Sequence, residues 1–134
     1  MGVQGAEILP LQTQEDIVVV RQAVRKYAIS LGFSLVDQTK IVTAASELAR
    51  NTVVYGGGGT VLIEPVDERG RSGLRLTFED HGPGIANVEE ALKNGYTTGT
   101  GLGLGLGGAR RLSSEFHIRS RVGEGTRVVI ARWK

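Results

Sequence analysis

The chain has 134 residues, of which 40% are hydrophobic and 22% charged, values typical of one globular domain that spans residues 1–134. Cysteine is absent and the two histidines have no second ligand at metal spacing, which excludes disulfides, thiolate sites and an ordinary zinc site. The net charge of +2 indicates no nucleic-acid surface, and without a signal peptide or a run of about 18 apolar residues we expect a cytoplasmic protein that enters no membrane.

The first elements predicted are a strand over residues 7–11 and a helix that begins after Thr13. Thr13 followed by Asp16 forms a capping-box-like start, and Gly32 stands where a helix C-cap belongs. Apolar residues between these points recur at spacings of three and four, which predicts that one face of the helix is core. This stripe consists of Ile17, Val20, Val24, Tyr27, Ala28 and Leu31.

A second helix and a pair of strands are predicted next. Ser34 and Asp37 repeat the helix start signal, and a run of four glycines ends the helix. Residues 60–66 and 74–80 alternate apolar and polar side chains, which predicts a hairpin with its turn at residues 67–70. The apolar stripe of the helix consists of Ile41, Ala44, Ala45, Leu48 and Thr52.

The C-terminal part combines a glycine-rich stretch with a closing hairpin. Residues 81–108 contain nine glycines, so we expect a long functional loop that includes a short helix at 88–93. A further helix is expected at 108–112, and the strands of the last hairpin at 116–122 and 126–133. This order of elements predicts an α+β two-layer sandwich with its helices on one face of the sheet.

The second helix carries the first of three motifs, SELARN at residues 46–51. Glu47 and Asn51 are four residues apart and share a helix face that is not the apolar stripe. A carboxylate one turn from a carboxamide can hold a hard cation through oxygen and orient a hydroxyl or a water for attack on phosphorus. An exposed polar pair on an ordinary helix has the same pattern.

The second motif, DHGPG at residues 80–84, follows a strand that alternates well. Two glycines and a proline favour a sharp bend, so the Asp80 carboxylate can face a pocket while the backbone passes close to a flat ligand. A carboxylate can accept a hydrogen bond from an exocyclic amine such as that of adenine. A surface turn has the same composition.

The third motif is the glycine run GTGLGLGLGG at residues 99–108. Glycines at alternate positions let successive N–H groups point at one anion, and the helix that follows offers its positive end, so phosphate is the expected ligand. A flexible loop also uses this composition. The run is not a P-loop, because no Gly-Lys-Ser/Thr follows, and the preceding loop argues against a Rossmann fingerprint.

Taken in order, the three motifs resemble the nucleotide-binding boxes of the Bergerat (GHKL) ATPases, which include histidine kinases, DNA gyrase and the anti-sigma serine kinases. Gly125-Thr126 in the last hairpin resembles the final adenine-side motif of that family. Over residues 16–133 the chain looks most like the serine/threonine switch kinases of bacterial stress signalling. The resemblance implies a Bergerat-type two-layer α/β sandwich with a mixed, mostly antiparallel sheet and a glycine-rich ATP lid.

The resemblance also implies a site for ATP and Mg²⁺. Asn51 would coordinate Mg²⁺, Glu47 would be the catalytic base or water-orienting carboxylate, and Asp80 would bind the adenine amino group. Arg50 is one of the basic residues that could support the phosphates. The residues implied to shape the adenine pocket, wrap the phosphates or cover the nucleotide are Gly82, Gly84, Gly101, Leu102, Gly103, Leu104, Gly105 and Thr126.

Two departures from the histidine-kinase pattern favour serine or threonine as the acceptor. That pattern has His before the Glu and often Lys three residues after the Asn, where this chain has Ser46 and Val54. The resemblance implies a kinase for a STAS-domain antagonist that also activates a PP2C-type phosphatase. The alternatives are an anti-sigma factor serine kinase that binds a sigma factor and a nucleotide-gated binding module without catalysis. We expect no nucleic-acid or membrane partner, and a weak homodimer stays open.

The remaining chemically active or aromatic side chains are interpreted as structural. His81 and His117 lack metal partners, and Tyr55 and Trp133 are placed at the edge of the core. Leu106 belongs with Leu102 and Leu104 to a set that either packs in the lid or forms a surface. A solvated face is the expected role of the basic residues Arg110, Arg111, Arg119 and Arg121.

Overall fold

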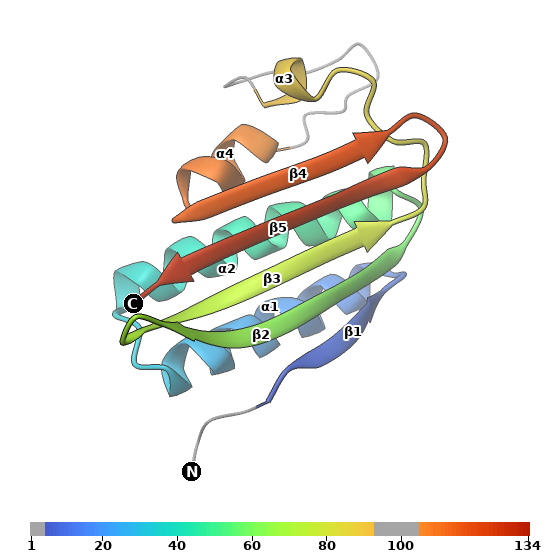
Figure 1. The fold of residues 1–134 in the computed structure, drawn as a ribbon. Coiled ribbons are helices and arrows are strands. Elements are labelled where there is room, and N and C mark those ends of the chain that lie inside the picture. The colour runs from blue at the N-terminus through green and yellow to red at the C-terminus, as the bar shows by residue number, and fades with distance from the viewer. Residues whose placement is uncertain (1–4, 93–104) are drawn as a thin grey trace.

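Five strands form one sheet with helices on one face in the computed structural model, which describes residues 5–92 and 105–134 (Figure 1). The four strand pairings are all antiparallel. The expected α+β sandwich is confirmed, and its mostly antiparallel sheet has no parallel pair among the described residues. In spatial order the strands are β1 (Glu7–Leu11), β2 (Gly59–Glu68), β3 (Arg71–Asp80), β5 (Gly125–Trp133) and β4 (Glu115–Arg121).

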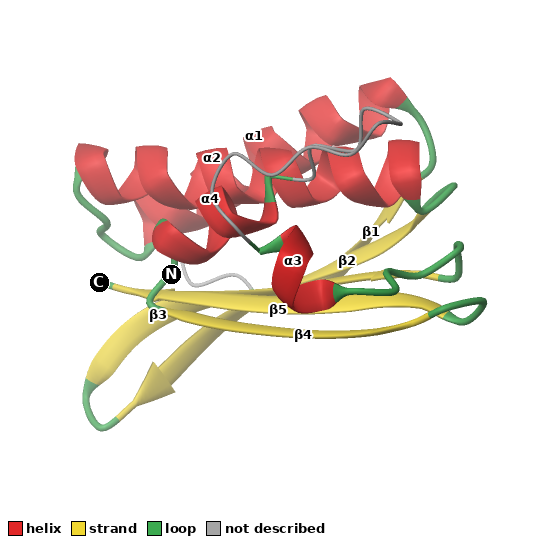
Figure 2. Cartoon of the chain, turned by 90° about the horizontal axis from the view of Figure 1, so that it is seen from above, coloured by secondary structure: helices red, strands yellow, loops and turns green. Residues whose placement is uncertain are grey.

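The two long helices lie side by side on one face of the sheet, and Figure 2 shows the two layers edge-on. The helical elements are α1 (Gln14–Ser30), α2 (Leu35–Arg50), the π-helical turn η1 (Asn51–Tyr55), α3 (Val88–Ala91) and α4 (Leu106–Arg111). Helix α4 packs against α2. None of these described helices combines the length and the apolar character needed to cross a membrane.

Both long helices begin at the residues that the sequence indicates. The Thr13 hydroxyl accepts from the Asp16 N–H (3.2 Å), and the Asp16 carboxylate accepts from the Thr13 N–H (3.1 Å), which completes a capping box. The Ser34 hydroxyl accepts from the Asp37 N–H (3.1 Å) at the start of α2. These bonds satisfy N–H groups that the first turn of a helix cannot pair.

Apolar side chains of α1, α2 and the strands form the core between the two layers. The predicted stripe of α1 is buried as far as Ala28, while Leu31 is partly buried. The stripe of α2 is buried throughout, and the Thr52 hydroxyl in it donates to the Leu48 carbonyl (2.9 Å), so burial leaves it satisfied. The buried residues that β3 contributes to the core are Leu74, Leu76 and Phe78.

Most strand and short-helix boundaries differ from the sequence predictions by one to three residues, and two of these differences matter for the fold. The turn between β2 and β3 contains only Arg69 and Gly70, because Glu68 already pairs with Arg71. Both turn residues have positive φ (52° and 78°), which is typical of a tight two-residue hairpin turn. Helix α4 begins at Leu106, two residues before the predicted start.

The two isolated aromatic residues have different positions. Tyr55 packs against the core, as predicted. Trp133 lies at the end of β5, outside the core cluster, where the Arg71 guanidinium is 4.9 Å from the centre of its ring. Its indole N–H donates to the Glu115 carboxylate (3.2 Å). Trp133 therefore packs on other residues at the end of the sheet and not in the core.

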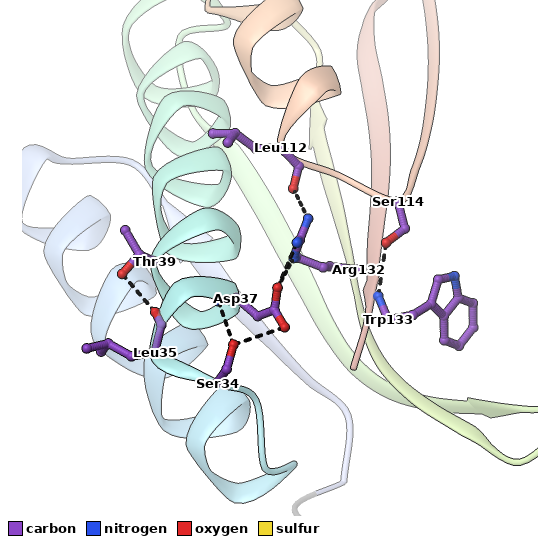
Figure 3. A network of polar contacts seen from close by, with 8 residues as sticks. All are labelled: Ser34, Leu35, Asp37, Thr39, Leu112, Ser114, Arg132 and Trp133. Carbon is purple, nitrogen blue, oxygen red and sulfur yellow. Dashed lines mark hydrogen bonds and ion pairs between the residues drawn. The ribbon is translucent and has the colours of Figure 1, made fainter.

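An ion pair ties the start of α2 to the sheet, at the end of the helix away from the SELARN motif (Figure 3). The Arg132 guanidinium on β5 donates to the Asp37 carboxylate (2.7 Å) and to the Leu112 carbonyl (2.8 Å). The Ser34 hydroxyl donates to the same carboxylate (3.1 Å). The Arg132 guanidinium lowers the pKa of Asp37, and the bond from Ser34 adds to this effect. Helix α2 is thus held at its N-terminal end by charge-assisted bonds.

Candidate functional site

Helix α2 passes into a π-helical turn at the last residue of the SELARN motif. The N–H of Asn51 donates to the Glu47 and Leu48 carbonyls, and its own carbonyl accepts from the Gly56 N–H, five residues on (2.8 Å). A π-turn adds one residue to a helical turn and is frequent at functional sites. Here it places Asn51 in the wall of a cavity between α2 and the sheet.

Asp80 is the last residue of β3, and backbone groups hold its carboxylate. Oδ1 accepts from the Gly82 N–H (2.9 Å). The N–H of Thr126, its register partner on β5, also bonds to this carboxylate. Burial raises the pKa of Asp80, and the two N–H groups, with a smaller contribution from the charge of His81, oppose the rise. The side chain is therefore a partly desolvated hydrogen-bond acceptor in a fixed position.

Glycines allow two stretches of backbone to approach Asp80. A Cβ on Gly56 would overlap the Asp80 carboxylate, and a Cβ on Gly82 would lie 2.5 Å from the Gly56 carbonyl oxygen. Gly84 has a φ of 75°, and its carbonyl accepts from the Tyr55 hydroxyl (2.7 Å), which fastens the bend to the π-turn. Gly56 is not among the predicted site residues, although it is the first residue of the four-glycine run.

Three of the predicted site residues share one cavity. Asn51 reaches it from η1, Asp80 from β3 and Thr126 from β5, and the apolar side chains of Ile85 and Leu106 complete much of the wall. The volume is about 20 Å³, room for about one water molecule. An adenine ring is several times larger, so a nucleotide can enter only if these walls move apart.

The Glu47 side chain on α2 lies next to Gly105, at the start of α4. The first and third motifs therefore meet at this point. Gly105 is the N-cap of α4 with a φ of 64°, and a Cβ there would overlap the Glu47 carboxylate. The carboxylate is thus in close contact with the last residue of the loop that was expected to wrap phosphates. Only a residue without a side chain permits this approach with a left-handed backbone.

The sequence-predicted residues fall into three groups. Those brought together are Asn51, Asp80, Thr126, Gly82 and Gly84 at the cavity and its bend, with Glu47 and Gly105 in contact beside α4. Arg50 is exposed and is not in the cavity wall. The predictions for Gly101, Leu102, Gly103 and Leu104 lie outside the described residues.

Ser120 is a site residue that the sequence analysis missed. It lies on β4 and hydrogen-bonds with Ile85, in the loop after β3, and with Thr126 on β5, so it joins two parts of the cavity wall. The inward positions of β4 before it hold Phe116 and Ile118, both packed against the core. A polar residue that continues an apolar series was the signal that could have identified it.

A larger groove of about 410 Å³ lies where the end of β3 meets the turn between β4 and β5, and it shares Asp80 and Thr126 with the smaller cavity. Its wall includes Arg119, Arg121 and Arg127, and Arg127 forms an ion pair with Glu79 (3.6 Å) in which both side chains are about half exposed. Ion pairs of this kind contribute little stability. The groove is open and polar and lacks the apolar walls that a flat base requires. The smaller cavity adds Asn51 and an apolar wall to Asp80 and Thr126, and is therefore the stronger candidate site.

The oxygen atoms near the SELARN motif suit a magnesium ion that is shared with a phosphate. Within residues 5–92 and 105–134, no group of three His, Asp or Glu side chains could hold a metal by itself. Asn51 offers a carboxamide oxygen and Glu47 a carboxylate, both hard ligands. Mg²⁺ commonly takes one or two protein ligands and completes its shell with phosphate and water, so these residues fit such an ion.

Comparisons with known proteins agree with this geometry. The family model of histidine kinase-, DNA gyrase B- and HSP90-like ATPases matches residues 36–134. Serine/threonine-protein kinase RsbT of Bacillus subtilis (strain 168) is 46% identical over 92% of each chain. The anti-sigma F factor of Anoxybacillus flavithermus (strain DSM 21510 / WK1) is 34% identical over 84% of this chain and 80% of its own.

A solved structure is similar in fold. The catalytic domain of histidine kinase ThkA has a TM-score of 0.56 and 18% identity, over 94% of this chain and 95% of its own. Identity this low supports the fold alone. With the family match over most of the chain, it confirms the Bergerat-type sandwich that the three motifs implied. The chain belongs to the family of histidine kinase-, DNA gyrase B- and HSP90-like ATPases.

Proposed function

We propose that this protein is an ATP-dependent serine/threonine protein kinase that phosphorylates a STAS-domain protein and, by changing partners, activates a PP2C-type phosphatase. The observation that carries the proposal is the cavity wall shared by Asn51, Asp80 and Thr126, with Glu47 in contact with Gly105, the residue before the wall residue Leu106. The likeness to a relative named as a serine/threonine-protein kinase, over 92% of both chains, supports the same activity.

The base of ATP would bind at the Asp80 end of the cavity. The Asp80 carboxylate would accept from the exocyclic amine, and Thr126 would support the ring through a water molecule. Gly82 and Gly84 keep the bend free of side chains, so that the backbone can lie along the flat ring. The apolar side chains of the wall exclude water from this end and strengthen the hydrogen bonds made there.

The phosphates would lie towards Asn51 and the start of α4. The Asn51 carboxamide would hold Mg²⁺, which when bound neutralises phosphate charge. The Glu47 carboxylate would accept the proton of the attacking serine or threonine hydroxyl. The glycine-run residues assigned to wrapping the phosphates and covering the nucleotide are Gly101, Leu102, Gly103, Leu104 and Gly105.

The exposed position of Arg50 changes its proposed role. Because Arg50 does not line the cavity, it would reach a phosphate only from outside the pocket, as Arg110 and Arg111 would from α4, where both are also exposed. Phosphoryl transfer depends mainly on positioning and charge neutralisation. We therefore assign the main phosphate contacts to the metal and the glycine run.

A second candidate function is that of an anti-sigma factor kinase, which the likeness to relatives named anti-sigma F factor favours. The chemistry at Glu47 would be the same, but the protein would also bind a sigma factor. Capture of a purified sigma factor in the presence of Mg-ATP would favour this alternative. ATP-dependent partner binding without phosphate transfer would favour a nucleotide-gated binding module.

The direct test combines the purified chain, Mg-ATP and a co-encoded STAS-domain protein, and locates the phosphate by mass spectrometry. We expect one phosphate on a serine or threonine of the STAS protein and stronger binding of the PP2C-type phosphatase after the transfer. The control replaces the mapped hydroxyl residue by alanine, which should abolish transfer. Phosphate on a histidine, or no transfer while ATP binds, would contradict the proposal.

A further inference from the structure

One face of the sheet is covered by none of the described helices, as the edge-on view in Figure 2 shows. The strand register places one residue of each strand in a row through the middle of this face. This middle row consists of Ile8, Leu62, Thr77, Val129 and His117. Each member alternates with core residues of its own strand, as Thr77 does with Leu76 and Phe78, so its side chain points away from the helices.

The middle row is more apolar than an open sheet face requires. Where one face of an antiparallel sheet is exposed to water, the outward positions are usually polar. Here Ile8 is 66% exposed, and Leu62 and Val129 are partly exposed. These side chains gain stability if another apolar surface covers them.

Charged side chains border the middle row on both sides. Glu79 of β3 and Arg119 of β4 lie two residues from it towards the turn between β4 and β5. Arg75 of β3 and Glu115 of β4 lie two residues from it on the opposite side. Both strands therefore carry opposite charges at equal distances from the row.

This arrangement makes the face complementary to itself. If a second copy is rotated by 180° about the middle row, each strand lies on its own counterpart. Glu79 then faces Arg75 of the second copy, and Arg119 faces Glu115 of the second copy. A two-fold axis parallel to the strands would instead bring Glu79 against Glu79 and Arg75 against Arg75. The charges therefore select the first axis, and symmetry repeats each favourable pair.

Arg119 gives independent support for a second copy. It lies directly opposite Arg127 in the register, and like charges in this position destabilise a sheet. Arg127 pairs with Glu79 (3.6 Å), whereas Arg119 has no ion-pair partner within residues 5–92 and 105–134. Glu115 of the second copy would supply the missing carboxylate.

We propose that two copies of this chain associate back to back through the uncovered sheet face, about a two-fold axis along the middle row. Two identical sheets can pack in this way with their inner side chains about 10 Å thick. The helices, and the candidate pocket between α2 and the sheet, stay on the outer sides of the dimer. The inference goes beyond the proposed kinase function and does not depend on it.

The size of the face determines how strong the association is. Five strands span about 24 Å across the sheet, and the seven residues of β4 span about 24 Å along it. Two such faces bury about 1,200 Å² together, the lower limit of specific interfaces. We therefore expect a reversible dimer with a dissociation constant in the micromolar range, about 10–100 μM.

Sedimentation equilibrium of the full chain over a range of concentrations measures this constant. Leu62→Lys places two like charges opposite each other at the axis and should weaken the dimer by at least about tenfold. Leu62 lies outside the core cluster, so the variant should fold. Leu35→Lys is the matched control, because Leu35 is an exposed leucine on α2, in the other layer, and it should leave the constant unchanged.

A charge exchange tests the axis itself. Arg119→Glu and Glu115→Arg each bring like charges together and should weaken the dimer, whereas the double variant restores opposite charges and should restore the dimer. The bond from the Trp133 indole to Glu115 is lost in Glu115→Arg and in the double variant alike, so it cannot cause the recovery.

Three results would overturn the proposal. They are a chain that stays monomeric even at about 1 mM, a dimer that Leu62→Lys leaves intact, and a double variant that is weaker than either single variant. A monomeric chain that transfers phosphate would refute the dimer and leave the kinase function intact. A dimer that transfers no phosphate would have the opposite meaning.

Discussion

The two ends of the candidate pocket are built in different ways. At the base end, Asp80, Gly82 and Thr126 are fixed by strand pairing and by backbone N–H groups that bond the carboxylate. At the phosphate end, Asn51 and Glu47 lie where α2 passes into a π-turn, and Gly105 of another element closes against Glu47. The difference suggests that the sheet sets nucleotide affinity, while the approach of α4 to α2 sets the rate of transfer.

Removing the Glu47 carboxylate is the largest expected perturbation, and it should affect only the phosphate end. In Glu47→Ala the acceptor hydroxyl loses its proposed base, so phosphate transfer should fall by at least about a hundredfold. The dissociation constant of Mg-ATP should change by less than about threefold, since Glu47 makes no proposed contact with the base. Single-turnover transfer and calorimetry measure the two quantities, and transfer at the normal rate would refute the assignment of Glu47.

Asp80→Asn perturbs the base end, so its main effect should be on ATP affinity, whereas that of Glu47→Ala is on the transfer rate. The variant keeps the shape but loses the charge, and one acceptor becomes an amide donor, so ATP affinity should fall by about tenfold or more. Calorimetry measures this loss. Unchanged ATP affinity would show that the base does not bind at Asp80.

The same variant has a characteristic effect on stability. Burial raises the pKa of Asp80, so its contribution to folding is most favourable when protonated and is lost as pH rises through the folded-state pKa. Asp80→Asn should therefore gain stability relative to wild type as pH increases from acid to neutral. Urea unfolding at several pH values measures the difference in unfolding free energy between the variant and wild type. If the variant instead became less stable relative to wild type as pH rose from acid to neutral, the burial of the charge would be contradicted.

Gly105→Ala tests the contact between α4 and α2. The left-handed φ of 64° costs a residue with a side chain about 1 kcal/mol, and the new methyl group would displace the Glu47 carboxylate. Transfer should fall by about tenfold, as it does when a catalytic group is misplaced. Gly108→Ala is the matched control, because its Cβ would meet only the Arg111 guanidinium at 3.9 Å. Equal rates for the two variants would argue against the Gly105 contact.

The ion pair between Asp37 and Arg132 lies at the other end of α2, so breaking it should have the smallest effect on the pocket. In Asp37→Asn the Arg132 guanidinium loses its charged partner, which should cost about 1–2 kcal/mol of stability at neutral pH. Because Arg132 lowers the pKa of Asp37, the stabilisation is present above the unfolded value of about 3.8 and is lost as pH falls through the folded value. The difference from wild type should therefore shrink below pH 4 in urea unfolding, with little change in ATP affinity.

The sequence was sufficient for the features that depend on local pattern. Alternation in β3, the spacing of apolar residues in α1 and the caps at Thr13 and Ser34 are each determined within a few residues. The motifs around Asn51 and Asp80 were recognised from their order and combination with the glycine run, because each motif alone is also typical of an ordinary surface.

Features that arise from contacts between distant segments were not predictable in this way. The π-turn after Arg50, the approach of Gly56 to Asp80 and the bonds of Ser120 all depend on which strand lies beside which. Arg50 illustrates the same limit, because its place in the motif did not reveal that its side chain is exposed. Ser120 is 35 residues from its partner Ile85 along the chain. Patterns that extend over only a few neighbouring residues therefore cannot predict that contact.

The most direct test of the pocket is an NMR titration of the labelled chain with a non-hydrolysable Mg-ATP analogue. If one pocket joins the three motifs, the amide signals of Asn51, Gly82, Gly105 and Thr126 should shift together and saturate at one concentration. Shifts confined to Arg119, Arg121, Glu124 and Arg127, with Asn51 and Gly105 unchanged, would place the nucleotide in the larger groove and contradict the shared pocket.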